Sequence, residues 1–238
     1  MSRFSHFGPE LVTALLAALA YSFWVDEVST VSDVLGGLAF AVHCSSFPAH
    51  IRQILLLERA KSPGANSELR SWLISTSNGV YLLWAISAGD DTIALARATG
   101  LVFAYMILAQ LVRFGSSRAK RIKACVLAAA VTALILSPHF TSLLVPLTSA
   151  LGVAAVALNW FALVFGNLHQ IAKLRRAEPS QRQLVSWQQK AVVTLRHVVW
   201  IAYAASLGFK DGWTPLLIHV VGAGVYGWTL WELRPRRS

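Results

Sequence analysis

Two arginines and three histidines lie deep inside segments that are otherwise apolar, and they are the side chains most able to do chemistry here. If those segments cross a membrane, a charge at the bilayer centre costs about 2.5–3.5 kcal/mol on insertion scales, so each residue is a candidate for substrate binding. Arg97 lies only about 9 Å along its segment, so the alternative is that it extends to the interface. The five residues are His43, Arg97, Arg196, His197 and His219.

No carboxylate accompanies these side chains, because all eleven Asp and Glu residues lie at the ends of the apolar segments or between them. An Asp/Glu proton relay therefore has no residues to use, although histidine can carry protons. Deep arginines without acidic partners are stabilised by an anion. We therefore expect a pocket that prefers a substrate bearing a carboxylate or a phosphate.

Asparagine and tryptophan side chains complete the candidate substrate-binding set. For Asn78 and Asn159, as for His43, a hydrogen bond within the core is the alternative. Trp84 and Trp200 are suited to stacking on a sugar or an aromatic ring, and the alternative for them is an interfacial aromatic belt. The sequence contains no catalytic motif and no metal-ligand or disulfide spacing. We therefore expect neither an enzyme nor a bound metal or cofactor.

The composition excludes a soluble, disordered or fibrous protein. Of the 238 residues, 55% are hydrophobic and 13% are charged, and the mean hydropathy is +0.55. A soluble domain has about 25% charged residues, so this chain lacks the charge to cover a surface exposed to water. The sequence therefore predicts an all-α membrane protein with several spans.

Eight segments are long and apolar enough to cross a bilayer as helices. Of the 21 Lys and Arg residues, all but Arg97, Arg196 and Lys210 lie on the side shared by both termini and the even-numbered loops. This distribution satisfies the positive-inside rule with both termini in the cytoplasm. It also explains the net charge of +10 without a nucleic-acid partner. The expected spans are roughly 9–25, 34–56, 71–88, 92–112, 122–138, 143–172, 185–206 and 213–232.

The first segment has two interpretations. The small residues Ala18-Leu19-Ala20 follow an apolar run, which resembles the cleavage site of a secretory signal peptide. The region before the run contains only one basic residue, Arg3, and Pro9-Glu10 opens the run. These features favour a retained transmembrane helix within residues 1–30.

An internal repeat divides the rest of the chain. Residues 53–60 are QILLLERA and residues 170–177 are QIAKLRRA, which is a period of 117 residues. Other matches have periods of 116 to 122, among them Leu35-Gly36 with Leu151-Gly152, His43 with Asn159, Trp84 with Trp200, and Gly100 with Gly222. We expect a first triple-helix bundle from a repeat at 31–115, a linker helix at 116–140, and a second triple-helix bundle, with a basic tail, from a repeat at 141–238. An odd linker helix makes the two repeats parallel, and transporters of this kind bind substrate at the midplane.

This 3+1+3 arrangement resembles the PQ-loop and SWEET transporter superfamily. The family motif is Pro-Gln, seven residues, then Lys-Ser, and here Gln53 precedes Lys61-Ser62 at that spacing. The second copy has Gln170 but Glu178-Pro179 in place of Lys-Ser, and the motif proline is absent from both copies. The end of the chain, YGWTLW, also resembles nicotinamide riboside carriers. The resemblance implies that Pro48, Gln53 and Gln170 act as gate or hinge residues.

The expected function is therefore transport of a small polar solute across the cell (inner) membrane by alternating access. The resemblance suggests sugars, the positive pocket an anionic solute, and the terminal Trp residues a nucleoside-like one. The alternatives are a receptor or sorting protein that does not transport, and an accessory subunit. The expected partners are the lipid bilayer and a small-molecule substrate. The sequence leaves open whether the chain forms a homo-oligomer, although the two repeats of one chain are enough to form a transport unit.

Overall fold

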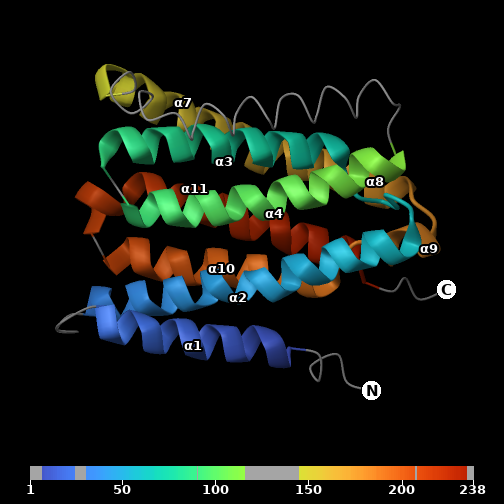
Figure 1. Cartoon of the computed structure of the whole chain (residues 1–238), viewed down its shortest axis with the longest axis horizontal. Coiled ribbons are helices and arrows are strands. Elements are labelled where there is room, and N and C mark those ends of the chain that lie inside the picture. The colour runs from blue at the N-terminus through green and yellow to red at the C-terminus, as the bar shows by residue number, and fades with distance from the viewer. Residues whose placement is uncertain (1–6, 25–30, 90, 116–144, 207, 235–238) are drawn as a thin grey trace. The chain divides into compact units, whose positions relative to one another are not determined.

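The computed structural model describes residues 7–24, 31–89, 91–115, 145–206 and 208–234, and these residues form helices joined by short loops (Figure 1). The all-α expectation is confirmed for these residues. The expected linker helix at 116–140 lies outside them. The elements are α1 (Gly8–Trp24), α2 (Val31–Ala60), α3 (Glu68–Ala88), α4 (Asp91–Gly115), η2 (Val145–Leu147), α7 (Thr148–Phe161), η3 (Ala162–Gly166), α8 (Asn167–Arg176), α9 (Pro179–Arg182), α10 (Trp187–Ser206) and α11 (Gly208–Glu232).

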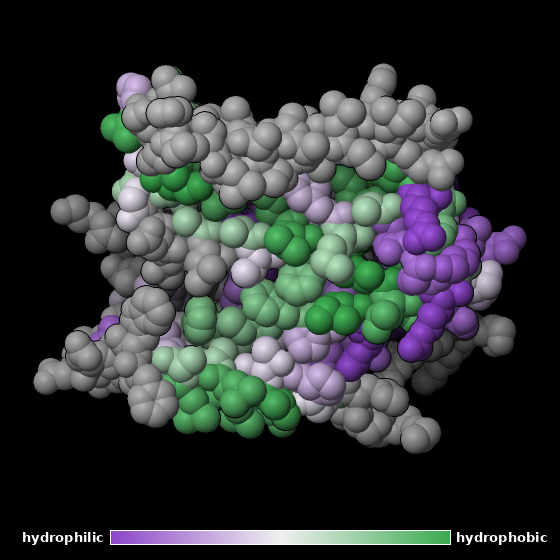
Figure 2. Space-filling model, in the orientation of Figure 1, coloured by the Kyte–Doolittle hydropathy of each residue, from purple (hydrophilic) through white to green (hydrophobic). Residues whose placement is uncertain are grey.

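Within the described residues, three helical stretches are long and apolar enough to cross a membrane: Asp33–Ala60, Arg97–Gly115 and Val145–Arg176. Their outward side chains are apolar, for example Val102 on α4 and Val153 on α7, which are 56% and 73% exposed. Figure 2 shows apolar residues over much of the visible surface, and hydrophilic residues where α2, α4 and α8 end. This division between an apolar wall and a polar end is typical of a membrane protein.

The helices α3 and α10 are less apolar because they carry buried polar side chains. Ser71, Ser75 and Ser77 are buried on α3, and Gln189 and Lys190 are buried on α10. Helix α3 packs against α4, α7 and α8, whereas α10 packs against α11. Polar side chains inside a membrane usually face the interior of the helix bundle. A hydropathy threshold therefore does not select helices that bury polar side chains in this way.

The helices form two compact units, which we call unit 1 (Met1–Leu55 and Val185–Ser238) and unit 2 (Leu56–Leu184). These units differ from the sequence repeats at 31–115 and 141–238. Unit 1 combines most of α2, from the first repeat, with α10 and α11 from the second. Unit 2 combines α3 and α4 from the first repeat with α7 and α8 from the second. The first helix of each repeat therefore packs within the unit that holds the second and third helices of the other repeat.

Matching glycines show this exchange at the level of single contacts. A Cβ atom on Gly36 of α2 would lie 3.3 Å from Cε2 of Tyr203 on α10. A Cβ atom on Gly152 of α7 would lie 3.0 Å from Nε1 of Trp84 on α3. Gly36 and Gly152 are the repeat pair identified in the sequence. Each one lets an aromatic side chain of the other repeat approach its helix backbone.

An interruption at the corresponding sequence position marks the first helix of each repeat. Pro48 lies inside α2, where it removes one backbone hydrogen bond. The π-helix η3 interrupts the continuous helix from Val145 to Arg176. A π-bulge inserts one residue into a helix, which explains why the repeat period is 116 before it and 117 after it. The counterpart of Pro48 is thus a change in helix geometry rather than a second proline.

Side chains bind the backbone beside both interruptions. The Nδ2 atom of Asn167 donates a hydrogen bond to the carbonyl oxygen of Leu163 at 2.7 Å. In the first repeat, Nδ1 of His50 lies 2.5 Å from the carbonyl oxygen of Ser46. Both contacts span four residues, and each pair lies 117 residues from its counterpart. Interruptions of this kind are where helices bend, so a hinge role for Pro48 stays a reasonable prediction.

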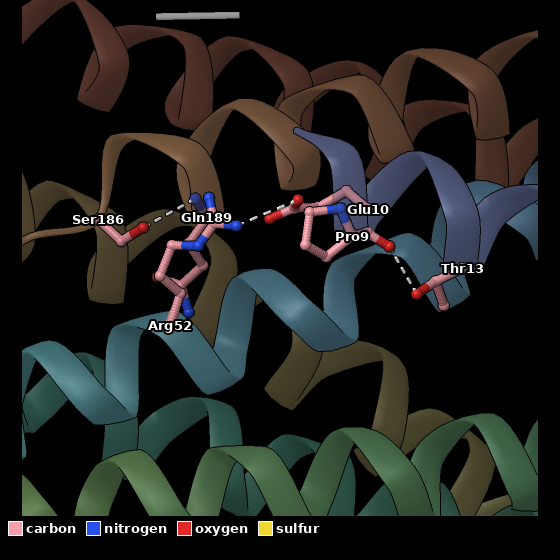
Figure 3. A network of polar contacts seen from close by, with 6 residues as sticks. All are labelled: Pro9, Glu10, Thr13, Arg52, Ser186 and Gln189. Atoms are coloured by element: carbon pink, nitrogen blue, oxygen red, sulfur yellow. Dashed lines mark hydrogen bonds and ion pairs between the residues drawn. The ribbon is translucent and has the colours of Figure 1, made fainter. Parts of the chain in front are cut away.

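An ion pair attaches α1 to α2 within unit 1 (Figure 3). The Nη2 atom of Arg52 lies 3.4 Å from Oε2 of Glu10, and the side chains are 28% and 4% exposed. Because the Glu10 carboxylate is buried, its pairing with Arg52 offsets the cost of removing that charge from water. Cleavage after Ala20 would remove the carboxylate that pairs with Arg52. This contact therefore favours the interpretation of α1 as a retained helix.

We expect the protein purified from membranes to retain α1, so that mass spectrometry detects peptides from residues 8–24. We also expect Glu10→Ala to lower the apparent melting temperature clearly more than Glu58→Ala, because Glu58 pairs with Arg113 at the exposed surface. Mass spectrometry and thermal unfolding in detergent measure the two results. A mature chain that starts near residue 21, or equal melting temperatures, would contradict the role given to α1.

Candidate substrate-binding clusters

Two serine caps define the register between the second helices of the two repeats. The Oγ atom of Ser67 accepts a hydrogen bond from the backbone N–H of Arg70 at the start of α3. The Oγ atom of Ser186 accepts one from the backbone N–H of Gln189 at the start of α10 (Figure 3). Such caps satisfy backbone donors that have no partner inside the helix. Each position of α3 therefore corresponds to the position 119 residues later in α10.

A buried glutamine binds each of these capped loops. The side chain of Gln170 accepts from the Ser67 backbone N–H at 2.8 Å and donates to the carbonyl oxygen of Ala65 at 2.7 Å. The side chain of Gln53 accepts from the Ser186 backbone N–H at 2.7 Å. Each glutamine thus holds the loop of the other repeat. In the structure, both glutamines hold a loop in place by hydrogen bonds, and their role as gates stays a prediction.

In unit 2, Arg97 contacts a polar and an aromatic side chain of α3. Its Nη1 atom donates a hydrogen bond to Oδ1 of Asn78 at 3.2 Å. Its guanidinium carbon lies 3.9 Å from the centre of the Tyr81 ring. Tyr81 in turn meets Trp84 edge-to-face, with ring centres 5.6 Å apart. We call Asn78, Tyr81, Trp84 and Arg97 the arginine cluster.

In unit 1, two histidines hold the corresponding positions. The Nδ1 atoms of His197 and His219 lie 2.9 Å apart. The His219 ring stacks on Trp200, and the His197 ring stacks on Tyr226, with ring centres 5.4 and 5.3 Å apart. Trp200 meets Tyr203 edge-to-face at 5.4 Å. We call His197, Trp200, Tyr203, His219 and Tyr226 the histidine cluster.

The two clusters are equivalent by position as well as by contact. In each cluster, a residue of the repeat's second helix is hydrogen-bonded to a residue of its third helix. An aromatic ring on the second helix lies over that third-helix residue and meets another aromatic ring edge-on. In the alignment set by the serine caps, Trp200 corresponds to Tyr81. The sequence alone aligned Trp200 with Trp84, which is three residues further along. The equivalent pairs are Asn78 with His197, Tyr81 with Trp200, Trp84 with Tyr203, and Arg97 with His219.

The other predicted binding residues lie beside these clusters or apart from them. Asn159 accepts a hydrogen bond from Ser77, which precedes Asn78, at 3.4 Å. His43, the repeat partner of Asn159, meets the Phe47 ring edge-on at 5.9 Å. Arg196 is half-buried and directly precedes His197. The structure thus brings Asn159 near the arginine cluster, and it places His43 against Phe47 on its own helix.

Three tyrosines of the clusters were not among the predicted binding residues, although the spacing of two of them was a usable signal. Tyr81 and Tyr203 lie three residues from Trp84 and Trp200, so each pair shares one face of a helix. Tyr226 lies seven residues after His219 on α11. Within the described part of the chain, no group of three or more His, Cys, Asp or Glu side chains is placed to hold a metal ion.

Gly222 provides a local test of the histidine cluster. A Cβ atom on Gly222 would lie 2.5 Å from Cε1 and 2.9 Å from Cγ of His197. We expect Gly222→Ala to displace the His197 ring and to change the fluorescence of Trp200 and its neighbours, because overpacking typically costs about 1–3 kcal/mol. At the matched position Gly100, a Cβ atom would lie 3.5 Å from Asn78, so Gly100→Ala should behave as the wild type. Equal melting temperatures and spectra for the two variants would contradict this packing.

Neither a protein-family model nor a curated protein sequence matches this chain. The function must therefore be inferred from the residues of the two clusters and from the helices that carry them.

Proposed function

We propose that the chain is a membrane transporter for a small polar solute, related in architecture to the PQ-loop and SWEET proteins. The observation that carries this proposal is the twofold occurrence of one cluster, with Asn78 and Arg97 in unit 2 and His197 and His219 in unit 1. Polar side chains are costly within apolar helices, and they mark substrate pathways in membrane proteins. A purely structural polar contact gives no reason for both repeats to carry it at corresponding positions.

The arginine cluster favours an anionic solute. A guanidinium has five N–H donors arranged to bind carboxylate or phosphate, and the Arg97 guanidinium contacts the amide of Asn78 and the ring of Tyr81. The aromatic rings of both clusters suit a solute that also has a sugar or a flat ring. A sugar phosphate, an aromatic carboxylate and a nucleotide-like solute all combine these features, and a neutral sugar lacks the charge.

The proposed topology has eight spans in a 3+1+3 order after α1, with both termini in the cytoplasm. In parallel repeats, equivalent loops lie on the same side of the membrane. The loops that follow the first helix of each repeat touch within unit 2, which supports this arrangement. The backbone N–H of Ala65 donates to the carbonyl oxygen of Gln181 at 3.0 Å, and Nδ2 of Asn66 donates to that of Leu184 at 2.9 Å. The surrounding helix ends are basic, as expected for a cytoplasmic face. The exposed basic residues there are Arg59, Lys61, Arg113, Arg175 and Arg176.

Uptake into proteoliposomes tests the proposal. The purified chain should transport a radiolabelled anion saturably above protein-free vesicles, in a panel of hexoses, sugar phosphates, nucleosides, nucleotides and carboxylates. Saturable binding without uptake would favour a receptor or sorting protein instead. A chain that neither binds nor transports alone, and co-purifies with a second membrane protein, would favour an accessory subunit.

A further inference from the structure

The histidine cluster differs from the arginine cluster in one chemical respect. Arg97 carries a permanent positive charge, whereas His197 and His219 change charge only by taking up a proton. Imidazole is the side chain whose unperturbed charge change falls between pH 5 and 8. The two equivalent clusters therefore carry the same charge when the histidine pair holds one additional proton, and they differ by one charge when it does not.

The geometry of the pair suits one additional proton and excludes a second. With the two Nδ1 atoms 2.9 Å apart, one ring must donate a hydrogen and the other must accept it. A proton added at Nε2 of the donating ring charges that ring and strengthens the shared hydrogen bond. A second proton would have to occupy the accepting Nδ1 atom, which would place two N–H groups against each other and break the contact.

The neighbouring rings also suit a charged pair. Trp200 stacks on His219 with an angle of 18° between the ring planes, and Tyr226 stacks on His197 with an angle of 27°. The faces of aromatic rings attract cations, so these rings stabilise an imidazolium without any carboxylate. Among the described residues, Tyr226 on α11 contacts the pair directly, Tyr203 on α10 reaches it through Trp200, and Arg196 precedes His197 on α10. On α2, the candidate is His43, because its repeat partner Asn159 lies beside the arginine cluster.

We propose that the hydrogen-bonded pair His197–His219 is a proton-binding site that couples movement of an anionic solute to movement of one proton in the same direction. This inference rests on the proposed transport function and adds its coupling ion. The proton enters at an imidazole nitrogen on one side of the membrane and leaves from the pair on the other, so no bond other than N–H forms or breaks. The protonated pair then gives unit 1 a positive charge that matches the charge of Arg97 in unit 2.

The experiment uses proteoliposomes that contain a pH-sensitive dye, with the membrane potential clamped and the anion identified by the uptake panel as the solute. With one proton per solute, an interior one pH unit more alkaline should accumulate a monovalent anion about tenfold at equilibrium, because each tenfold ratio is balanced by about 1.4 kcal/mol. The dye should report proton entry together with the solute. The variant His169→Gln, which changes a histidine outside both clusters, should keep both results.

Two variants separate coupling from transport. His219→Gln should transport without accumulation. The double variant with His197→Asn and His219→Arg copies the Asn78–Arg97 pair, and it should also give an accumulation ratio of about one because its charge is permanent. Wild-type uptake without accumulation or proton entry would overturn the coupling and leave the transport function intact, as would unchanged accumulation in either variant. Absence of uptake by the wild type would overturn the proposed function and this inference with it.

Discussion

Replacing Arg97 by glutamine should reduce solute uptake about 10- to 100-fold, which is the largest effect on transport that we expect from a single substitution. Hydrogen bonds to charged groups are worth about 1.5–3 kcal/mol, and glutamine removes both the charge and the guanidinium fork that would bind the anion. Arg97→Lys keeps the charge but loses the fork and the planar stacking on Tyr81. We therefore expect Arg97→Lys to transport at an intermediate rate.

Arg113→Gln is the matched control for this prediction. Arg113 lies near the end of the same helix, α4, but its side chain is 59% exposed and pairs with Glu58. This substitution should leave the uptake rate near that of the wild type. Initial rates in proteoliposomes with equal amounts of inserted protein provide the measurement. Equal rates for Arg97→Gln and Arg113→Gln would remove Arg97 from the solute site.

The largest effect on stability should come from Gln170→Ala. The side chain is 1% exposed and makes two short hydrogen bonds to the loop that begins α3. Its removal leaves the Ser67 N–H and the Ala65 carbonyl buried without these partners, and each such group costs about 1–3 kcal/mol. The expected loss in the free energy of unfolding is therefore about 2–6 kcal/mol. Gln170→Glu keeps the acceptor but not the donor, so it should also be destabilised.

Gln181→Ala is the control for the Gln170 variants. The Gln181 side chain is exposed, and the loop uses its backbone carbonyl, which alanine retains. Apparent melting temperatures in detergent should rank the wild type and Gln181→Ala together, with Gln170→Ala far below them. If Gln170→Ala melted with the control, the fastening role of the glutamines would be wrong.

The helices and their approximate limits could be predicted from the sequence because apolar length is a local property. The expected spans at 34–56 and 71–88 lie within α2 and α3, which begin and end only a few residues further out. The repeat could also be identified from Gln53 and Gln170. The change of period from 116 to 117 was visible as well, but its physical cause, the π-helix η3, depends on backbone geometry that no residue type specifies.

Contacts between distant segments could not be predicted in the same way. The sequence showed two repeats of three helices, and the natural expectation was that each repeat packs on itself. The exchange of the first helices follows from contacts such as Gly36 with Tyr203, which leave no periodic pattern. Glu10 likewise gave no signal as a partner of Arg52, because an acidic residue at the start of an apolar run is common at a helix N-terminus.

The candidate site was partly predictable for a related reason. Arg97, His197 and His219 stood out because ionisable residues are rare in apolar segments, and the structure places each of them in one of the two clusters. Tyr81 and Tyr203 did not stand out, because aromatic residues are common in membrane helices. Their role became visible only when Ser67 and Ser186 set the register between α3 and α10.

Accessibility of the arginine cluster from both sides of the membrane tests the central claim of alternating access most directly. A single cysteine at Gly100, where a Cβ atom fits 3.5 Å from Asn78, would report it after Cys44 and Cys125 are replaced by alanine. We predict that Gly100→Cys reacts with a membrane-impermeant maleimide added to either side of oriented vesicles, and that bound solute slows both reactions. A cysteine at Val153, an exposed apolar residue, should not react from either side. Reaction of Gly100→Cys from one side only, or from neither, would contradict transport by this chain.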